Sequence, residues 1–392
     1  MGAVNDRGAK EVVISDLVCV YVSVQGSSCP ARLHVVLGNE ACDLDSAVSA
    51  LVYAFLLHSL LKEEEEQEEA EEGRTVVVVP VLNIPRRDYE LRTEVTYWLD
   101  KHQIRREDLF FRDEVELTER HRADGLQLTL VDHNLLPAAD AHLDPAVVNV
   151  LDHHKLERQS GSVSGCMVVE MVGSCCTLVA EKLRVQKPSL LDPVIASLLY
   201  GTIILDTVNL SEAAKRVTPK DVNIIQCLKP LVCPTVERDQ LFQELTSAKT
   251  DVSGLTPEQL LRKDVKVATG KSLRVGVASL PMMVKEYLRR PSIDTCLSEH
   301  SIAQGYDVLV VMGYSIVGEM VIRDIAVFSG HEDLRSQLVP HLCEAQGGLL
   351  QLEAMDFGID GCSAFQQRNA AASRKVVLPI VKDWLELALN NH

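Results

Sequence analysis

The fold is decided by the segment LQLTLVDHNLLPAADAHLDPAVVNVLDHH, residues 126–154. It contains two short apolar runs: the run at 126–131 is followed directly by Asp132, and the run at 146–151 by Asp152. Runs of this length, bounded by turn residues, are typical of buried strands. The segment therefore predicts two β-strands that each present an acid at the C-terminal end.

The sequence on the N-terminal side repeats this design. The run LHVVLG, which starts at Leu33, ends in a glycine turn, and residues 46–61 then carry apolar side chains at helical spacing. The run TVVVVPVL, which starts at Thr75, shows no polar alternation, as expected for a strand covered by helices on both faces. Alternating strands and helices predict an α/β fold with a mainly parallel sheet.

A second series of strands follows a turn-rich stretch after residue 206. We predict strands at 273–280, 306–312 and 321–328, and they indicate a smaller α/β C-terminal domain. The boundary is expected near residues 225–245. This gives an unassigned N-terminal extension at 1–30, a first domain at 31–230 and a second at 240–388.

Composition limits the class of protein. The chain has 392 residues, 46% of them hydrophobic, which is enough for about two domain cores. It lacks the roughly 20 uninterrupted apolar residues of a membrane helix and the pattern of a secretory signal. We therefore expect no membrane insertion and an intracellular location, in the cytoplasm with the nucleus as a second site. Eleven scattered cysteines without a CxxC pair are expected to be reduced thiols.

The net charge of −17 argues against nonspecific binding to nucleic acid, which needs a basic surface. Much of the negative charge is local, and like charges at this density repel and stay solvated. We predict an acidic loop at residues 62–73, between a helix and a strand. Its acids are Glu63, Glu64, Glu65, Glu66, Glu68, Glu69, Glu71 and Glu72.

Acidic and imidazole side chains follow several of these predicted strands. In parallel sheets the carboxyl ends of the strands meet at one crevice, where ligands bind, so acids from distant parts of the chain are expected to meet in space. One further acid closes the apolar run LLYGTIILD. The candidates are Asp43, Asp45, Asp132, Asp152, His153, His154 and Asp206.

Carboxylates gathered in this way repel one another, and cations are the economical means of neutralising them. Oxygen ligands with one or two imidazoles suit Mg²⁺ or Mn²⁺, and two such ions can polarise a phosphate and activate a water. Each motif alone has a structural alternative. Asp45 or Ser46 can cap the following helix, Asp132-His133 can form a surface turn, and the imidazoles of His153 and His154 can be structural.

Eight ordered motifs resemble the animal prune proteins of the DHH phosphoesterase superfamily. The resemblance covers nearly everything from about Leu33 to the last helix, and it extends to exopolyphosphatases and family II inorganic pyrophosphatases. The motifs are GNEACDLDS, VPVLNIPR, LVDHN, VLDHHKLE, EMVGSCCTL, GTIILDTVN, DVSGLTPEQLLRKDVK and SRKVVLP.

The resemblance implies roles for individual residues. Metal ligands would be Asp43, Asp45, Asp132, His153 and Asp206. Asp132, His133 and His154 would act in catalysis. Substrate phosphate would be bound by Asn39, His154, Lys266, Arg374 and Lys375. Arginine can bind a phosphate through two nitrogens, which lysine cannot do. The active site would lie in the cleft between the domains and hold Mg²⁺ or Mn²⁺, two ions or more.

Two departures from the wider superfamily concern this site. Position 39 is Asn where pyrophosphatases usually place a histidine ligand, an exchange that favours Mg²⁺ over Mn²⁺. The namesake triplet is DHN, residues 132–134, in place of DHH, which leaves the role of its third position open.

The resemblance implies a metal-dependent phosphohydrolase, foremost an exopolyphosphatase that releases terminal phosphate from short-chain polyphosphate by a metal-bound hydroxide. Two alternatives stay open: a cyclic nucleotide phosphodiesterase, and a signalling or scaffold protein in cell migration with little catalytic activity and signalling proteins as partners. The gathering of acids favours an enzyme, because a scaffold has no physical need to collect them.

Overall fold

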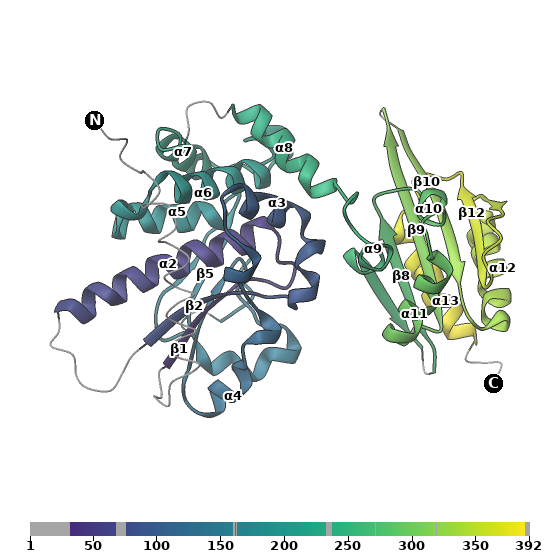
Figure 1. Ribbon diagram of the computed structural model, residues 1–392, viewed down its shortest axis with the longest axis horizontal. Coiled ribbons are helices and arrows are strands. Elements are labelled where there is room, and N and C mark those ends of the chain that lie inside the picture. Colours follow the sequence, from purple (N-terminus) through teal and green to yellow (C-terminus); the bar gives the residue numbers. More distant parts are fainter. Residues whose placement is uncertain are drawn as a thin grey trace, which may run out of the picture. The chain divides into compact units, whose positions relative to one another are not determined.

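Residues up to Thr250 build one sheet with its own helices, and residues from Asp251 build another, so the chain forms two compact units (Figure 1). The computed structural model describes residues 32–388, except 68–75, 160, 162, 233–236, 271 and 319. The unassigned N-terminal segment 1–30 lies outside the described residues.

The sheet of the first unit is parallel throughout, with strand order β3-β2-β1-β4-β5-β6. The prediction of a mainly parallel sheet is confirmed. The strands are β1 (Arg32–Leu37), β2 (Val76–Leu82), β3 (Phe110–Phe111), β4 (Leu126–Val131), β5 (Val147–Asp152) and β6 (Met167–Val169).

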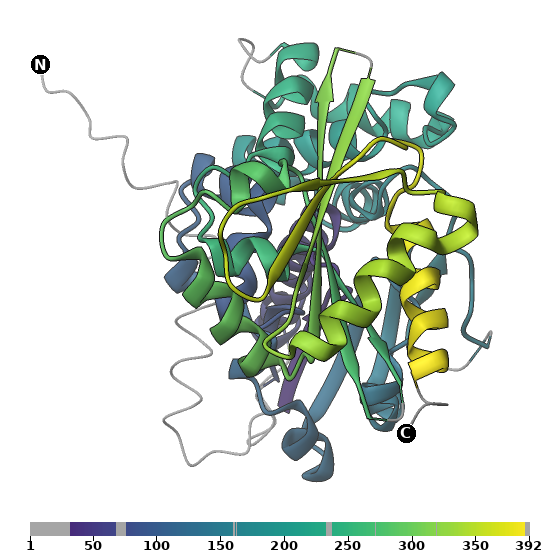
Figure 2. The ribbon, with the colours of Figure 1, turned by 90° about the vertical axis from the view of Figure 1, so that its right-hand side faces the viewer.

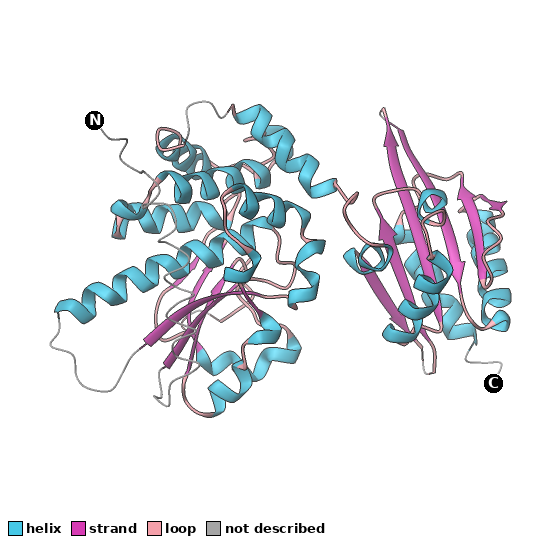
Figure 3. Ribbon diagram, viewed as in Figure 1, coloured by secondary structure: helices cyan, strands magenta, loops and turns pink. Residues whose placement is uncertain are grey.

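Helices cover both faces of this sheet, which explains the lack of polar alternation in its strands (Figure 3). Val36 of β1 packs into the core that contains α2, α5 and α6, whereas its neighbours Val35 and Leu37 pack into the core that contains α4. The helices are α2 (Leu44–Gln67), α3 (Thr93–Lys101), α4 (Leu117–Arg122), α5 (Cys175–Gln186), α6 (Pro193–Asp206), α7 (Pro219–Leu228) and α8 (Arg238–Thr250).

The second unit has a six-stranded sheet in the order β11-β12-β10-β9-β8-β7, antiparallel except for the pair β8 and β9. One face packs on α9, α10 and α11, and the other on α12 and α13, which lie side by side in Figure 2. The elements are α9 (Pro257–Lys263), β7 (Val265–Thr269), β8 (Arg274–Leu280), α10 (Val284–Tyr287), α11 (Ile293–Gln304), β9 (Val308–Val317), β10 (Met320–Phe328), α12 (Glu332–Gly348), β11 (Leu352–Met355), β12 (Cys362–Gln367) and α13 (Arg374–Ala388).

The acidic segment differs from the predicted loop. Helix α2 continues to Gln67, so residues 62–67 are helical, and residues 68–75 lie outside the described part of the chain. Glu and Lys are good helix formers, and Glu63 pairs with Lys187 at 2.8 Å, while Lys187 also donates to the carbonyl oxygen of Ser59. These contacts extend the helix past its apolar part.

The division between the units also lies later than the sequence indicated. The predicted start of the second domain, residue 240, lies within α8, but this helix packs on α3 and α6 and so belongs to the first unit. Its contacts are Leu241 and Leu245, both buried in the core of that unit. The turn after Thr250 then leads to α9.

Helix α2 is the only described helix long and apolar enough to cross a membrane, and 78% of its most apolar stretch is buried inside the unit. Figure 1 shows it between the sheet and the helices α5 and α6, with which it is in contact. The apolar character of α2 is therefore that of a central core helix.

Helix α6 carries Asp206 at its C-terminal end. Asp192 caps its N-terminus by accepting the amide hydrogens of Val194 and Ile195, both at 2.8 Å, and Pro193 occupies the first turn. The helix lies close to α3, because a Cβ atom on Gly201 would lie 2.3 Å from the buried ring of Trp98. The glycine thus permits a helix contact that fixes where Asp206 lies.

We predict that Gly201→Ala destabilises the protein by about 1–2 kcal/mol, because overpacking against Trp98 outweighs the gain in helix propensity. Urea unfolding measures this change. Gly125→Ala is the control in the same unit, since the nearest atom to its Cβ is an ordinary 3.6 Å away. An equal effect of the two substitutions would contradict the packing argument.

Candidate functional site

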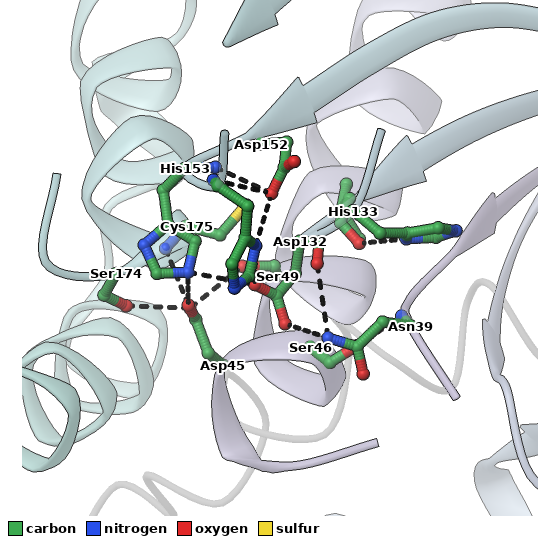
Figure 4. Close-up of polar contacts among 12 residues, drawn as sticks. Asn39, Asp45, Ser46, Ser49, Asp132, His133, Asp152, His153, Ser174 and Cys175 are labelled. Carbon is green, nitrogen blue, oxygen red and sulfur yellow. Dashed lines mark hydrogen bonds and ion pairs between the residues drawn. The ribbon is translucent and has the colours of Figure 1, made fainter. Parts of the chain in front are cut away.

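Of the acids and imidazoles predicted as candidates, all but Asp152 line one pocket of the first unit, and Asp152 contacts His154. The pocket has a volume of about 530 Å³, and it lies where β1, β4 and β5 end, beside the C-terminal end of α6. Figure 4 shows the polar contacts of Asn39, Asp45, Asp132 and His153 there. The lining residues that the sequence analysis singled out are Asn39, Asp43, Asp45, Asp132, His153, His154 and Asp206.

Asp132 lies at the centre of this group, 2% exposed. Its φ of 61° is left-handed, a conformation that Asp and Asn tolerate better than most residues. Oδ2 accepts a hydrogen bond of 2.7 Å from the side-chain amide of Asn39. Oδ1 is buried and has no hydrogen-bond partner among the described residues, although Nε2 of His153 lies 3.1 Å away. Asn39 therefore orients one carboxylate oxygen and leaves the other open to a cation.

The ring of His153 is held in one orientation. Its Nδ1 lies 2.9 Å from the carbonyl oxygen of Val172, which can only accept, so Nδ1 carries the hydrogen. Nε2 then faces the acids, 3.1 Å from Oδ1 of Asp132 and 3.4 Å from Oδ2 of Asp45. A lone pair on this nitrogen, fixed by a backbone carbonyl on the far side, is the usual arrangement of a metal-binding histidine.

Asp45 connects the pocket to the start of α5. Its carboxylate accepts the amide hydrogens of Cys175 at 2.7 Å and Cys176 at 2.9 Å, and the hydroxyl of Ser174 at 2.7 Å. The positive end of a helix stabilises a carboxylate in this position. Asp45 is thus fixed by α5, and it is Asp43 that accepts an amide hydrogen in the first turn of α2, from Ser46 at 3.3 Å.

Asp206 is the last residue of helix α6, whereas the other acids of the pocket follow strands. Its Oδ2 is buried and has no hydrogen-bond partner among the described residues. Burial, and then the negative charge of Asp45, raise the pKa of Asp43, Asp132 and Asp206. These three carboxyls therefore call for either a proton or a cation.

The donor set fits a divalent cation. One ligand atom each from Asp132, His153 and His154 can be chosen so that all lie within 4.8 Å of one another. Two buried carboxylate oxygens without donors, on Asp132 and Asp206, face the same pocket. Carboxylates with one or two imidazoles are ligands for Mg²⁺ or Mn²⁺.

Comparisons with known proteins show which family the chain belongs to. The DHH family N-terminal domain matches residues 34–203, and the DHHA2 domain matches residues 243–384. The chain is 40% identical over 362 residues to exopolyphosphatase PRUNE1 of Mus musculus, over 92% of this chain and 77% of that protein. The chain belongs to the prune branch of the DHH family.

Other relatives of this prune chain carry related names. It is 30% identical over 385 residues to a putative exopolyphosphatase of Schizosaccharomyces pombe, over 91% of this chain and 92% of that protein. It is 25% identical over 298 residues to the manganese-dependent inorganic pyrophosphatase of Methanocaldococcus jannaschii, over 73% and 84% of the two chains. The resemblance inferred from the motifs is confirmed.

His133, predicted to act in catalysis, does not line the pocket of the prune chain. Its Nδ1 lies 2.9 Å from the carbonyl oxygen of Val131, and the ring points away from the carboxylate of Asp132 (Figure 4). Burial lowers the pKa of His133, and its Nε2 has no hydrogen-bond partner among the described residues. The structure therefore places this ring outside the group of acids.

The three cations predicted to bind phosphate lie in the second unit. Lys266 is exposed on β7, and Lys375 is exposed in the first turn of α13. Arg374, at the start of α13, donates to Oδ1 of Asp264 at 2.7 Å and to its carbonyl oxygen at 2.8 Å. This contact brings the start of α13 to the beginning of β7, near Lys266 in the chain.

Asn134 is the third residue of the DHN triplet, whose role the sequence does not reveal, and in the structure it holds neighbouring segments together. Its side-chain amide donates to Oδ2 of Asp152 at 2.5 Å, and its Oδ1 accepts the amide hydrogens of Glu157 and Arg158. Asp152 in turn accepts from Nδ1 of His154 at 2.9 Å. Asn134 thus fixes the conformation of the loop that carries His153 and His154. The triplet alone does not reveal these contacts.

The chain reverses direction after Asp206 through three successive left-handed residues. The φ angles are 51° at Val208, 59° at Asn209 and 59° at Leu210. Such φ angles are unusual for residues other than glycine, most of all for a β-branched residue such as valine. Each costs on the order of 1–3 kcal/mol. The side chain of Thr207 stabilises the turn by accepting the amide hydrogen of Leu210.

This turn leads to basic residues that the sequence analysis missed. Lys215 and Arg216 line the pocket together with Lys155. A basic pair ten residues after a candidate metal ligand was the available signal, but nothing in the sequence shows that the turn brings it back to the pocket.

We predict that the chelated protein loses stability as the pH rises above 6.5. Burial alone would lower the pKa of His153. In the chelated protein, however, a second proton on Nε2 can be donated to Asp132, 3.1 Å away, and together with the charge of Asp45 this raises the pKa to about 10. The stabilising effect of this proton is therefore lost as the pH rises above the unfolded pKa of His153. The raised pKa of Asp132 acts in the same direction, because the folded chain again binds more protons than the unfolded one.

Thermal unfolding with a chelator at several pH values between 6 and 8.5 measures this loss. Mn²⁺ should raise Tm, and by more at the higher pH, because bound ligands must be deprotonated. Asp132→Asn should flatten the pH dependence of the chelated protein, whereas Asp124→Asn, an exposed turn residue before β4, should not. A Tm that is independent of both pH and Mn²⁺ would contradict the assignment of a metal site.

Proposed function

We propose that this prune protein is a metal-dependent phosphohydrolase that releases terminal phosphate from short-chain inorganic polyphosphate. The observation that carries the proposal is the pair of buried carboxylate oxygens without donors, on Asp132 and Asp206, which face the same pocket as the ring of His153. The names of its relatives, exopolyphosphatase and manganese-dependent inorganic pyrophosphatase, support the cleavage of phosphoanhydride bonds.

The metal ligands of the proposed site are Asp43, Asp45, Asp132, His153 and Asp206. Divalent cations held there supply Lewis-acid activation of the phosphate and of the attacking water. The chain itself fixes the ligands before the ions bind: Asn39 orients Asp132, Val172 orients His153, and α5 orients Asp45. Manganese or magnesium, in two ions or more, would satisfy this set.

His154 is the proposed contact of the pocket with substrate. Its Nδ1 lies 2.9 Å from Oδ1 of Asp152, and its side chain is 56% exposed. Burial alone would raise the pKa of Asp152, but hydrogen bonds from His154 and Asn134 lower it, so this carboxyl stays ionised. Hydrogen bonding to Asp152 also raises the pKa of His154, which favours the protonated ring that can donate to a phosphoryl oxygen.

We predict that Asp132→Asn lowers phosphate release by at least about 100-fold, because the amide removes the charge that binds a cation. Asparagine is the right replacement, since it tolerates the left-handed backbone of this position better than alanine does. Asp124→Asn is the matched control: it is also an aspartate with a left-handed φ, of 53°, and it lies before the other end of β4.

The assay compares triphosphate, pyrophosphate and cyclic AMP in Mg²⁺ and in Mn²⁺. Faster release from triphosphate than from the other two supports the exopolyphosphatase assignment, and cleavage of cyclic AMP alone would replace it with phosphodiesterase activity. If folded, metal-loaded protein cleaves none of them, the scaffold alternative replaces the enzyme assignment. If Asp132→Asn is as active as wild type, the assignment of the site around Asp132 is wrong.

We predict that Arg374→Lys lowers kcat/KM for triphosphate by about 10- to 100-fold. The guanidinium of Arg374 donates to Asp264 through Nη1 and Nη2 and still has hydrogens left for a phosphate, whereas lysine has one nitrogen for both contacts. Arg368→Lys is the control, since Arg368 lies in the same unit and pairs with exposed Glu353. A loss that appears equally in both variants would show that Arg374 has no special contact with substrate. Thermal unfolding checks that the lost contact with Asp264 has not unfolded the second unit.

A further inference from the structure

The rim of the pocket carries a short basic segment, the 215–218 loop, which runs from Lys215 to Thr218 between α6 and α7. All four of its residues line the same pocket as the acids. Lys215 and Arg216 are exposed, whereas Asp45 and Asp132 are 3% and 2% exposed. The cations therefore lie at the open edge of a pocket whose acids lie deep inside.

Neither basic side chain is neutralised by an acid of the described part of the chain. The contrast with the next lysine is clear: Lys220, at the start of α7, pairs with Glu170 at 2.5 Å and with Glu181 at 2.9 Å. The two adjacent cations line the same pocket as the acids and have no ion-pair partner in the described part of the chain, so their hydrogens are available to an anion that enters the pocket.

The loop is held firmly to the framework of the metal ligands. Buried Asp221 accepts both the amide hydrogen and the hydroxyl of Thr218 at 2.7 Å, and it accepts the amide hydrogen of Gly173 at 2.9 Å. A Cβ atom on Gly173 would lie 2.8 Å from the carbonyl oxygen of Arg216. The loop and the segment that begins with Val172, whose carbonyl orients His153, are thus fixed to one carboxylate.

The backbone of the loop is itself constrained. Lys215 has a φ of 53° and a ψ of 34°, a left-handed conformation that is unusual for lysine. Such strain persists only where the surroundings determine the conformation, and it is common at ligand sites. The position from which the Lys215 side chain leaves the backbone is therefore defined by the fold.

We propose that Lys215 and Arg216 bind phosphoryl groups further along the substrate than the one that is cleaved, and so favour chains of three or more phosphates over pyrophosphate. The proposal rests on the proposed function and names the part of the substrate that reaches the rim. A polyphosphate bound by its end in the depth of the pocket leaves its remaining charged groups at the edge, where the two cations lie. Pyrophosphate is too short to leave more than one group outside.

The test compares kcat/KM for inorganic triphosphate with kcat/KM for pyrophosphate in Lys215→Met, Arg216→Met and the double variant. We expect the ratio of triphosphate to pyrophosphate to fall about tenfold in the double variant, because charge-assisted hydrogen bonds to the distal phosphate are lost. Lys229→Met is the matched control: it removes one exposed cation from the same unit, just after α7, and should leave the ratio unchanged.

The outcomes separate this inference from the proposed function. If wild type cleaves both substrates and the double variant keeps the wild-type ratio, the distal site is wrong and the hydrolase assignment stands. If wild type cleaves neither, equilibrium binding of triphosphate and pyrophosphate in Mg²⁺ takes the place of kinetics. A wild-type preference for triphosphate that the double variant loses then supports the distal site alone, and equal binding of both anions by all variants overturns it.

Discussion

Repulsion among buried carboxylates is the constraint on which the rest of this structure depends. Asp43, Asp45, Asp132 and Asp206 line one pocket, although they come from three separate parts of the chain. Bringing them together costs free energy that the fold must supply, and the raised pKa of three of them records that cost. The parallel sheet supplies the framework, because its strand ends lie along one edge and α6 delivers the last acid to the same edge.

Neutral groups hold these acids in place. Asp45 accepts backbone amides at the start of α5, Asp132 accepts an amide from Asn39, and the ring of His153 is turned by a backbone carbonyl. None of these partners carries a charge that would compete with a cation for the carboxylates. Hydrogen bonds from neutral groups thus orient the ligands without cancelling the negative charge that attracts a divalent cation.

The sequence predicts the inner strands β1, β2, β4 and β5 of the first sheet well, because fully buried parallel strands are continuous apolar runs. It does not predict the short strands β3 and β6 at the edges of that sheet. It does not reveal which way a side chain turns just after a strand, so His133 was grouped with Asp132 although its ring points away. Contacts across long sequence separations, such as those of Asn134 with Asp152 and Glu157, are likewise invisible to a motif. The extension of α2 to Gln67 depends on Lys187, more than a hundred residues away.

The left-handed turn at Val208, Asn209 and Leu210 has a consequence for protein engineering. A designer seeking thermostability would put glycine at Val208, where the backbone now carries strain. That exchange would relax the turn and also loosen the connection between Asp206 and the 215–218 loop, since glycine has many more accessible conformations. A substitution at this turn that raises thermal stability is therefore expected to make the position of the 215–218 loop at the pocket less well defined.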